Sequence, residues 1–389
     1  MYLKLVLALA NFAGSLSRAT KKGNGVMVAG RVILKMAPNS VAQLAKNKRI
    51  VLISGTNGKT TTTRLIAAAL SQKYSVATNS TGANLFAGIA AALGAKPSAD
   101  VAALEVDELV LPWAIENCQP ELVVLLNLGR DQLDRLSEVR IVTNKWRNAL
   151  KNQTLVLANA DDPFVTYSAQ SALKPIWFSA GENSHLDAAT CPECGSLLDW
   201  GNTGYSCNCG FSKPKPDWIL GENISAISSI PGKAAAQNAA QALIVAKEFG
   251  VPEAAAKEAI ASVTSVDGRF ATKKISDVDF RLLLSKNPAS WKETLSTSAL
   301  GPKNVLLMVN ANTQDGKDTS WLWDVDFTPL KGRNVLVSGD RRSDVSARLT
   351  VDGIEHQIVE NENVASGLFG HGDADLIASY TAFHRLVNR

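Results

Sequence analysis

The first half of the chain alternates short apolar runs with stretches of helical periodicity. The runs contain many β-branched residues, which favour strands, and turn residues separate them from the helical stretches. Such an alternation predicts an α/β fold with a mostly parallel sheet and helices on both faces. The predicted strands are Lys48–Ser54, Val101–Val106, Glu121–Leu128 and Thr154–Ala158, and the predicted helices include Thr62–Ser71 and Asn84–Gly94.

The pattern changes in the second half. From about His185 to Pro216 it consists of Cys, Gly, Pro and Asn, which indicates a small inserted module. New apolar runs after residue 271 predict a smaller, Rossmann-like α/β domain. We therefore expect a helical lead-in (1–45), a central domain (46–270, with the insert at 185–216) and a C-terminal domain (271–389). Further helices are predicted at Ala234–Phe249 and Pro252–Val263, and further strands at Phe280–Leu284, Asn304–Val309 and Asn334–Val337.

The N-terminus has two interpretations. Residues 1–13 faintly resemble a secretory signal, but the nucleotide motif described below needs a cytoplasmic setting. We expect an amphipathic helix instead, because Leu3, Val6, Leu9 and Ala13 have helical spacing. No apolar run approaches the roughly 18 residues that cross a bilayer, so we do not expect an integral membrane protein.

Composition narrows the class further. Of the 389 residues, 46% are hydrophobic and 20% are charged, as in folded soluble domains. Lys and Arg number 40 against 36 Asp and Glu, without long runs of one sign. This net charge of +4 does not indicate nucleic-acid binding. Binding of an anionic ligand must therefore be argued from a local group of residues and not from the overall charge.

A glycine-rich loop is the strongest sign of chemistry. It follows the first predicted strand, opens a helix and reads Gly55-Thr56-Asn57-Gly58-Lys59-Thr60-Thr61. Backbone N–H groups of such a loop bind phosphate oxygens. Lys59 adds a charge for the β/γ-phosphates, and the Thr60 hydroxyl can reach a bound Mg²⁺. Ile53 stands where the general P-loop has a glycine, so we expect a shortened ATP-binding variant.

Four of the five cysteines lie close together in the inserted module. They form the knuckles Cys191-Pro-Glu-Cys194-Gly and Cys207-Asn-Cys209-Gly. Two such knuckles can place four thiolates around Zn²⁺, although the second is shorter than the usual Cys-x-x-Cys. A disulfide and unrelated free thiols remain the alternatives. We expect a closed zinc ribbon that stabilises the fold, and a buried, unreactive Cys118.

The variant loop resembles that of the Mur ligase superfamily, whose members couple ATP hydrolysis to amide-bond formation. Glu105, in the segment LEVDE, ends a predicted strand, and the resemblance implies that it holds Mg²⁺. A surface acidic cluster is the alternative. The segment NLGRDQLDR (127–135) resembles the family's next motif, but Gln132 stands where a metal-binding histidine is usual. A second metal site is therefore in doubt.

The resemblance continues through the central domain. The turn NADDP (159–163) matches the family, and Asn238 would hydrogen-bond adenine. Arg269, in the segment Gly-Arg-Phe, would contact the ATP phosphates. Lys145 lies roughly where several relatives carry a carbamylated lysine, although a solvated helix lysine is the preferred interpretation.

The cysteine insert narrows the resemblance to the MurT branch, the synthetase subunits of lipid II isoglutaminyl synthase. Similar stretches follow at SKNPA (285–289), SGDRRSD (338–344), Tyr380-Thr381-Ala382 and DGKDTSWLWD (315–324). In this branch the last of these faces the active site and the partner. Asp318 is our favoured catalytic aspartate, with Asp315 as a further candidate. On spacing alone, these residues and Asp324 are a turn with surface carboxylates beside two tryptophans.

The resemblance implies a specific reaction. ATP would phosphorylate the α-carboxylate of D-isoglutamate in lipid II, and ammonia would displace phosphate to give D-isoglutamine. The chain has no recognisable glutaminase nucleophile, so a GatD-like glutaminase subunit would supply ammonia in a heterodimer at the inner face of the membrane. Two alternatives remain. One is an amino-acid-adding Mur or folylpolyglutamate-type ligase, and the other is a zinc-ribbon ATPase that binds nucleic acid, which the charge balance disfavours.

Overall fold

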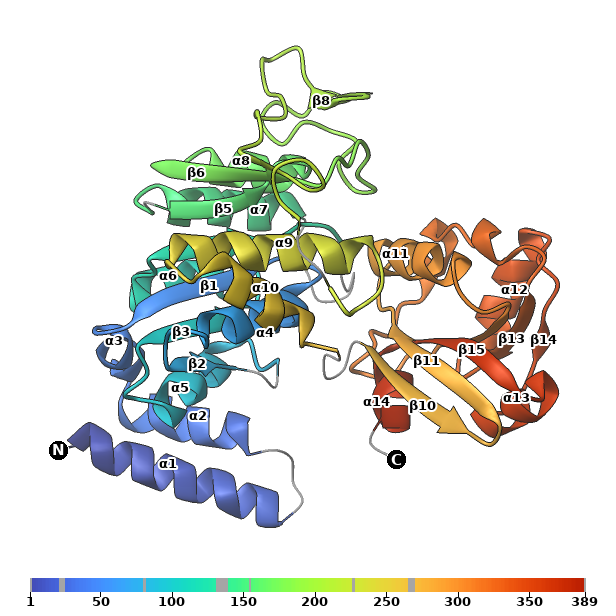
Figure 1. The fold of residues 1–389 in the computed structure, drawn as a ribbon, viewed down its shortest axis with the longest axis horizontal. Helices are drawn as coiled ribbons and strands as arrows, with labels where there is room; N and C mark the ends of the chain where they lie inside the picture. The colour runs from blue at the N-terminus through green and yellow to red at the C-terminus, as the bar shows by residue number, and fades with distance from the viewer. Residues whose placement is uncertain are drawn as a thin grey trace. The chain divides into compact units, whose positions relative to one another are not determined.

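Figure 1 shows the fold in a computed structural model, which describes residues 2–20, 25–79, 82–130, 139–153, 155–225, 228–264 and 270–387. These residues form two compact units with separate sheets. The first unit comprises the described parts of Met1–Gly129, Ser137–Ser229 and Ala236–Val263, and the second those of Arg130–Leu136, Ile230–Ala235 and Thr264–Arg389. The lead-in of residues 1–45 therefore belongs to the same unit as the central sheet.

A seven-stranded sheet forms the middle of the first unit. Its order is β2-β3-β1-β4-β5-β6-β9, and every neighbouring pair is parallel. The predicted parallel sheet is therefore confirmed. The strands are β1 (Arg49–Ser54), β2 (Val76–Thr78), β3 (Val101–Glu105), β4 (Leu122–Leu125), β5 (Leu155–Asn159), β6 (Lys174–Ser179) and β9 (Trp218–Ile219).

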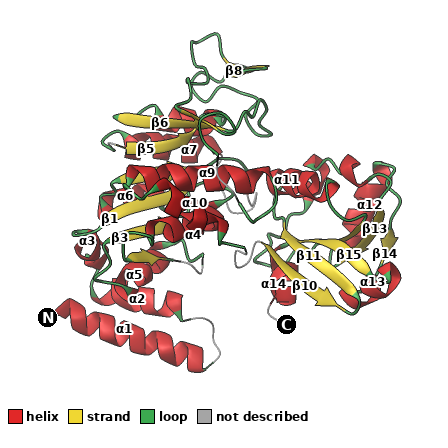
Figure 2. Ribbon diagram, viewed as in Figure 1, coloured by secondary structure: helices red, strands yellow, loops and turns green. Residues whose placement is uncertain are grey.

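Helices cover both faces of this sheet (Figure 2), and strand side chains alternate between two apolar cores. In β1, Ile50 and Leu52 enter the core that includes α5 to α8, whereas Val51 and Ile53 enter the core with α4, α9 and α10. Burial on both faces explains the continuous apolar runs. The helices are α4 (Lys59–Leu70), α5 (Phe86–Ala95), α6 (Leu111–Cys118), α7 (Val139–Leu150), α8 (Pro163–Ala169), α9 (Lys233–Glu248) and α10 (Glu253–Ala261).

Three lead-in helices add outer layers to one face: α1 (Tyr2–Ala19), α2 (Val26–Met36) and α3 (Ser40–Ala45). The predicted N-terminal helix exists, but its buried face agrees only in part with the predicted apolar positions, because Leu3 and Ala13 are half-buried. Val6, Leu7, Ala10 and Gly14 are buried, whereas Leu9 is exposed. The small residue Gly14 lets α2 approach closely, and this close packing favours burial of the face that contains it. Among the described residues, no helix is long and apolar enough to cross a bilayer.

The second unit has a six-stranded sheet in the order β10-β11-β15-β12-β13-β14. Only β10 is antiparallel to its neighbour. The predicted smaller α/β domain is therefore confirmed. Its elements are β10 (Phe270–Ile275), β11 (Val278–Leu284), α11 (Pro288–Ala299), β12 (Asn304–Met308), β13 (Asn334–Ser338), α12 (Arg342–Val351), β14 (Gln357–Ile358), α13 (Glu362–Phe369), β15 (Gly372–Ala378) and α14 (Tyr380–Val387), with 3₁₀ turns η1 (Ser320–Asp324) and η2 (Thr328–Leu330).

Candidate active site

The glycine-rich loop joins the carboxyl end of β1 to the N-terminus of α4. Gly58 has φ = 85° at the position before the helix, a conformation that favours glycine. A Cβ on Gly55 would lie 2.9 Å from the Leu126 Cβ, so that position also requires glycine. The loop therefore has the strand–loop–helix form that the sequence predicted, with its amides at a helix N-terminus.

The segment that follows β4 forms hydrogen bonds with the glycine-rich loop. The Asn127 side chain accepts a hydrogen bond from the Asn57 amide (2.8 Å) and donates one to the Asn57 carbonyl (3.0 Å). The Thr56 hydroxyl accepts from the Gly129 amide at 3.0 Å, and the Thr56 amide donates to the Asn127 carbonyl at 2.8 Å. These paired bonds fix the loop before any ligand binds.

Lys59 is held inside the loop and is only 5% exposed. Its Nζ lies 2.9 Å from Glu108 Oε1 and donates to the carbonyl oxygens of Gly55 (2.5 Å) and Thr56 (3.3 Å). Glu108 is itself buried. The charge of the Lys59 ammonium group is therefore neutralised within the protein. A phosphate that binds Lys59 must replace Glu108 or the loop carbonyl oxygens as its partner.

Glu105 ends β3 beside the loop and is 2% exposed. Its Oε1 accepts from Asn84 Nδ2 at 3.0 Å, whereas its buried Oε2 has no hydrogen-bond partner among the described residues. A Cβ built on Gly82 would lie 3.8 Å from the Thr60 hydroxyl and 3.9 Å from this Oε2. A buried carboxylate oxygen without a hydrogen-bond partner and a threonine hydroxyl, both within 4 Å of this Cβ position, fit the oxygen ligands that Mg²⁺ prefers.

Asn238 reaches the loop from α9. Its Oδ1 would lie 2.9 Å from a Cβ on Gly58, so the amide side chain packs directly on that glycine. The structure therefore brings Asn238 to the loop, while its contact with adenine stays a prediction. Gln132 and Arg269 lie outside the described residues.

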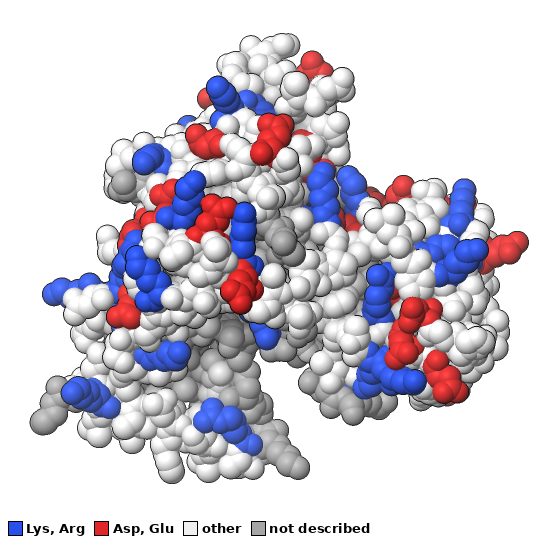
Figure 3. Space-filling model, viewed as in Figure 1, with Lys and Arg blue, Asp and Glu red and all other residues white. Residues whose placement is uncertain are grey.

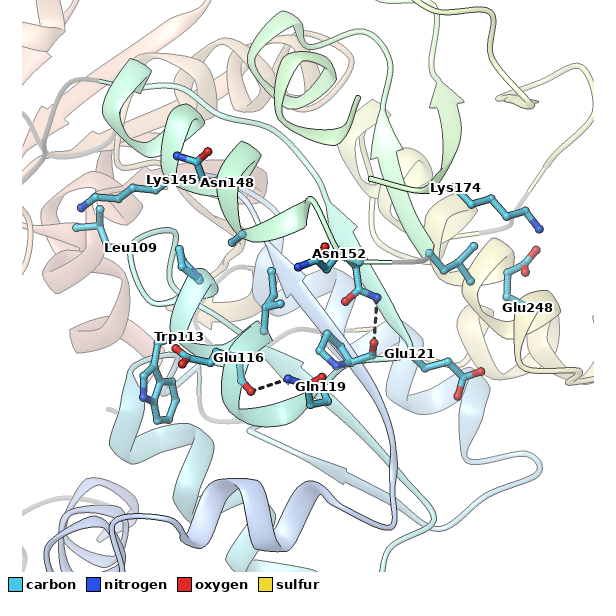
Figure 4. A pocket seen from close by; sticks show the side chains of 16 residues that line it. Leu109, Trp113, Glu116, Gln119, Glu121, Lys145, Asn148, Asn152, Lys174 and Glu248 are labelled. Atoms are coloured by element: carbon cyan, nitrogen blue, oxygen red, sulfur yellow. Dashed lines mark hydrogen bonds between the residues drawn. The ribbon is translucent and has the colours of Figure 1, made fainter. Parts of the chain in front are cut away.

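Lys145 is an exposed residue of α7 at one end of a groove of about 1230 Å³. Figure 4 shows it beside Leu109, with Trp113 and Glu116 further along α6 and with Lys174 and Glu248 at the opposite end. The expected carbamylation stays a prediction, and the exposed position fits a solvated helix lysine.

The four clustered cysteines converge as the zinc prediction requires. Their sulfur atoms all lie within 4.8 Å of one another, with Sγ–Sγ separations of 3.7 Å (Cys191–Cys209) and 3.5 Å (Cys194–Cys207). Zn–S bonds of about 2.3 Å in a tetrahedron place sulfurs roughly 3.8 Å apart. All five cysteines of the chain are free thiols, so the disulfide alternative is not supported.

A short hairpin between the two knuckles joins this insert to helix α8. It consists of β7 (Asp199–Gly201) and β8 (Gly204–Ser206), which pair antiparallel. The buried Tyr205 hydroxyl bonds to Thr166 Oγ1 at 2.7 Å, and its ring stacks on Phe211. Lys213 forms an ion pair with the buried Asp161 (2.7 Å). The insert is therefore packed onto the central unit through buried contacts.

Asp162 joins three parts of the unit. One carboxylate oxygen caps α8 by accepting from its first amides, and the other accepts from the Leu128 amide at 2.7 Å. The second oxygen also lies 3.2 Å from His185 Nε2. Burial lowers the pKa of His185, but the charge and hydrogen bond of Asp162, together with the charge of Asp187 and a hydrogen bond to the Leu128 backbone, raise this pKa overall.

Polar side chains also gather at the carboxyl edge of the second sheet. The buried Asp315 accepts from the Asn312 amide (3.0 Å) and from the Thr381 amide and hydroxyl (2.8 and 2.6 Å). It therefore positions the loop against α14. Asp318 is exposed, and the Ser320 amide that donates to it at 2.8 Å lowers its pKa. Trp323 is exposed beside the buried Trp321.

Several residues of these sites had no predicted role. Glu108 stood in the segment LEVDE, but only a structure shows that it pairs with Lys59. Asn84, Asp162 and Thr381 likewise act through partners distant in sequence. Asp162 and Thr381 lay in segments that the resemblance singled out without giving these residues a role, and Asn84 lies in a polar stretch that carries no distinguishing signal.

Known families, proteins and structures are similar to this chain over most of its length. The Mur ligase middle domain family matches residues 53–246, and the MurT ligase C-terminal family matches residues 284–383. The lipid II isoglutaminyl synthase (glutamine-hydrolyzing) subunit MurT of Staphylococcus aureus (strain COL) is 30% identical, over 92% of this chain and 89% of its own. The subunit of the same name from Streptococcus pneumoniae (strain ATCC BAA-255 / R6) is 30% identical, over 98% and 96%. The structure of a pseudomurein peptide ligase type C from Methanothermus fervidus shares the fold, with a TM-score of 0.65, 20% identity and coverage of 90% and 80%.

Proposed function

Because the chain belongs to the MurT family of Mur ligases, we propose that it is the synthetase subunit of a lipid II isoglutaminyl synthase. The observation that carries the proposal is a likeness to MurT over nearly the entire chain, from the ATP loop through the cysteine insert to the C-terminal family match. The proposed activity is ATP-dependent amidation of a carboxylate in peptidoglycan synthesis.

The reaction would proceed in two steps. An oxygen of the D-isoglutamate α-carboxylate attacks the γ-phosphorus of ATP, and the bond to the β-phosphate oxygen breaks to release ADP. Ammonia then attacks the acyl carbon, phosphate leaves, and the nitrogen loses a proton to give the amide. Both steps build negative charge on phosphate oxygens, which the protein must stabilise.

The glycine-rich loop supplies most of that stabilisation. Its amides at the start of α4 would hold the phosphates, and Lys59 would exchange Glu108 and two loop carbonyls for phosphate oxygens. Arg269 would add a second positive charge. Asn238, which packs on Gly58, would orient the adenine.

Glu105 and Thr60 would hold Mg²⁺, because one buried oxygen of Glu105 faces the same glycine as the Thr60 hydroxyl. The metal supplies charge neutralisation between the phosphates. Glu105 needs no proton transfer in this role. Asn84 would fix the carboxylate through its 3.0 Å hydrogen bond.

The C-terminal unit would work with a partner. Asp318 carries a lowered pKa and stays ionised, so it can orient a catalytic imidazole of a GatD-like glutaminase. Both carboxylate oxygens of Asp315 accept hydrogen bonds from within the unit. Asp315 is therefore better suited to positioning its loop than to catalysis. We expect a heterodimer that acts at the inner face of the membrane, where lipid II is made.

Mass spectrometry of lipid II tests the proposal. Incubation of the isolated chain with ATP and ammonium should give the small mass decrease that replacement of OH by NH₂ produces. Glutamine should become an effective donor only after a glutaminase subunit is added, because docking raises the local ammonia concentration. Glu105→Gln should abolish amidation, whereas Glu116→Gln, an exposed-groove carboxylate, is the matched control.

Two results would overturn the proposal. Addition of an amino acid instead of ammonia would assign the chain to the amino-acid-adding ligases. Efficient use of glutamine by the isolated chain would remove the need for a partner.

A further inference from the structure

Helix α1 carries a second apolar face that no described part of the protein covers. Five large side chains on it are between 42% and 70% exposed. Their spacing of three or four residues places them along one stripe of the helix. The stripe consists of Tyr2, Leu5, Leu9, Phe12 and Leu16.

The helix that bears the stripe is firmly packed. Its other face contributes Val6, Leu7, Ala10 and Gly14 to the interior. A Cβ on Gly14 would lie 3.1 Å from the Gly25 carbonyl oxygen and 3.3 Å from the Ala29 Cβ, so α1 and α2 are in close contact. Figure 1 shows α1 as the outermost layer, with α2 between it and α5. The stripe is therefore an outer surface of a fixed helix.

The charge around the stripe has one sign. The first 99 residues contain 13 Lys and Arg and no Asp or Glu, whereas the remaining 290 contain 27 basic and 36 acidic residues. Exposed basic side chains of α1 and α2 include Lys4, Arg18, Arg31 and Lys35. On the face drawn in Figure 3, Lys and Arg but no Asp or Glu lie over α1 and α2. An acidic or anionic surface is the complement to such a region.

We infer that α1 docks this protein on an anionic lipid bilayer, with the stripe in the acyl boundary and the basic residues at the headgroups. An apolar helix face combined with cationic flanks is the arrangement of helices that lie in a membrane interface. Lys4 and Arg18 have long side chains that can reach headgroups while the stripe is immersed. Docking on the bilayer would bring the enzyme to the membrane that holds a lipid-linked substrate; this consequence rests on the proposed function.

Vesicle co-sedimentation of the full chain tests the docking without ATP or lipid II. Binding is expected to vesicles that contain phosphatidylglycerol, to weaken with salt, and to be much poorer with phosphatidylcholine alone. The double change Phe12→Ser and Leu16→Ser should weaken binding at least tenfold, because it removes two apolar side chains from the buried stripe. Lys4→Glu should weaken binding more than fivefold, since each basic residue near an anionic surface strengthens it roughly fivefold.

Matched controls separate the stripe from apolar exposure in general. Leu173→Ser and Leu300→Ser remove side chains that are 71% and 93% exposed elsewhere, and both should bind vesicles like the unchanged chain. Thermal unfolding and zinc content of the stripe variant should stay close to those of the unchanged chain, because Phe12 and Leu16 are 70% and 55% exposed.

Three outcomes would overturn the inference: no binding to anionic vesicles at low salt, equal binding by the stripe variant, or a stripe that instead joins two copies of the chain in light scattering. Because the assay contains no substrate, its failure is distinct from failure of the proposed function. If the chain binds vesicles but does not amidate lipid II, the docking inference holds and the proposed function fails. In reconstituted vesicles, the stripe variant should raise KM for lipid II with kcat unchanged.

Discussion

Replacing Lys59 tests both the ATP site and the buried ion pair within it. A lysine in such a loop is expected to be solvent-facing and free of interior contacts, so that Lys59→Ala would remove turnover and leave stability intact. The structure contradicts the second half of that expectation, because Nζ is buried 2.9 Å from Glu108. Lys59→Ala leaves Glu108 as a buried carboxylate without its counter-ion.

The size of the effect follows from that geometry. Removal of one partner of a buried ion pair costs about 3 to 5 kcal/mol. We expect the lower end, about 3 kcal/mol, because water can enter the space and solvate Glu108. For a unit of this size, such a loss lowers the unfolding temperature by roughly 6 to 12 °C.

A double-mutant cycle distinguishes the pair from the loop. Glu108→Gln in the Lys59→Ala background removes the unpaired charge, so most of the lost free energy of unfolding should return. ATP turnover should stay absent in the double variant, because the phosphate charge clamp is still missing. The assay is urea unfolding followed by tryptophan fluorescence, together with ADP release. Unchanged stability in Lys59→Ala, or near-normal turnover in either variant, would refute the reasoning.

Three further predictions concern other groups. Elemental analysis should find about one Zn²⁺ per chain, and Cys194→Ser should lower the unfolding temperature more than it changes ATP affinity; absence of zinc from reduced protein would contradict this. Burial raises the pKa of Cys118 to about 12, so at about pH 8 a thiol reagent should label this residue only after unfolding, as peptide mapping would reveal. The raised pKa of His185 stabilises the fold below the ordinary histidine pKa of about 6.5, and this contribution is lost as pH rises through the raised pKa, so the stability gap to His185→Asn should narrow as pH rises from about 6 into the alkaline range.

Apolar runs were enough to predict the strands on which the ATP loop depends, since β1, β3, β4 and β5 are buried on both faces. They failed for β15, whose sequence contains the fully buried Asp375. That carboxylate is paired with Arg281 at 2.6 Å, and a charge neutralised by a distant partner leaves no apolar pattern. They also failed for β6, where Pro175 argues against a strand although it pairs with Val156.

The candidate site also has parts that the sequence predicts and parts that only the structure shows. The loop and the cysteine knuckles are contiguous motifs, so spacing alone identified them. The pairing of Lys59 with Glu108 and the packing of Asn238 on Gly58 depend on tertiary contacts between segments whose separation in sequence carries no local signal. Residue types at such positions are unremarkable until the sheet brings them together.

The packing of Asn238 on Gly58 also has a consequence for the order of folding. The two residues are 180 positions apart, and every strand from β2 to β9 lies between them in the sequence. Contacts of such long range form slowly, because a large loop must close before they contribute. The chain emerging from a ribosome therefore completes its phosphate loop long before the helix that covers it exists. Nucleotide affinity should arise abruptly, late in synthesis, when α9 joins the finished sheet.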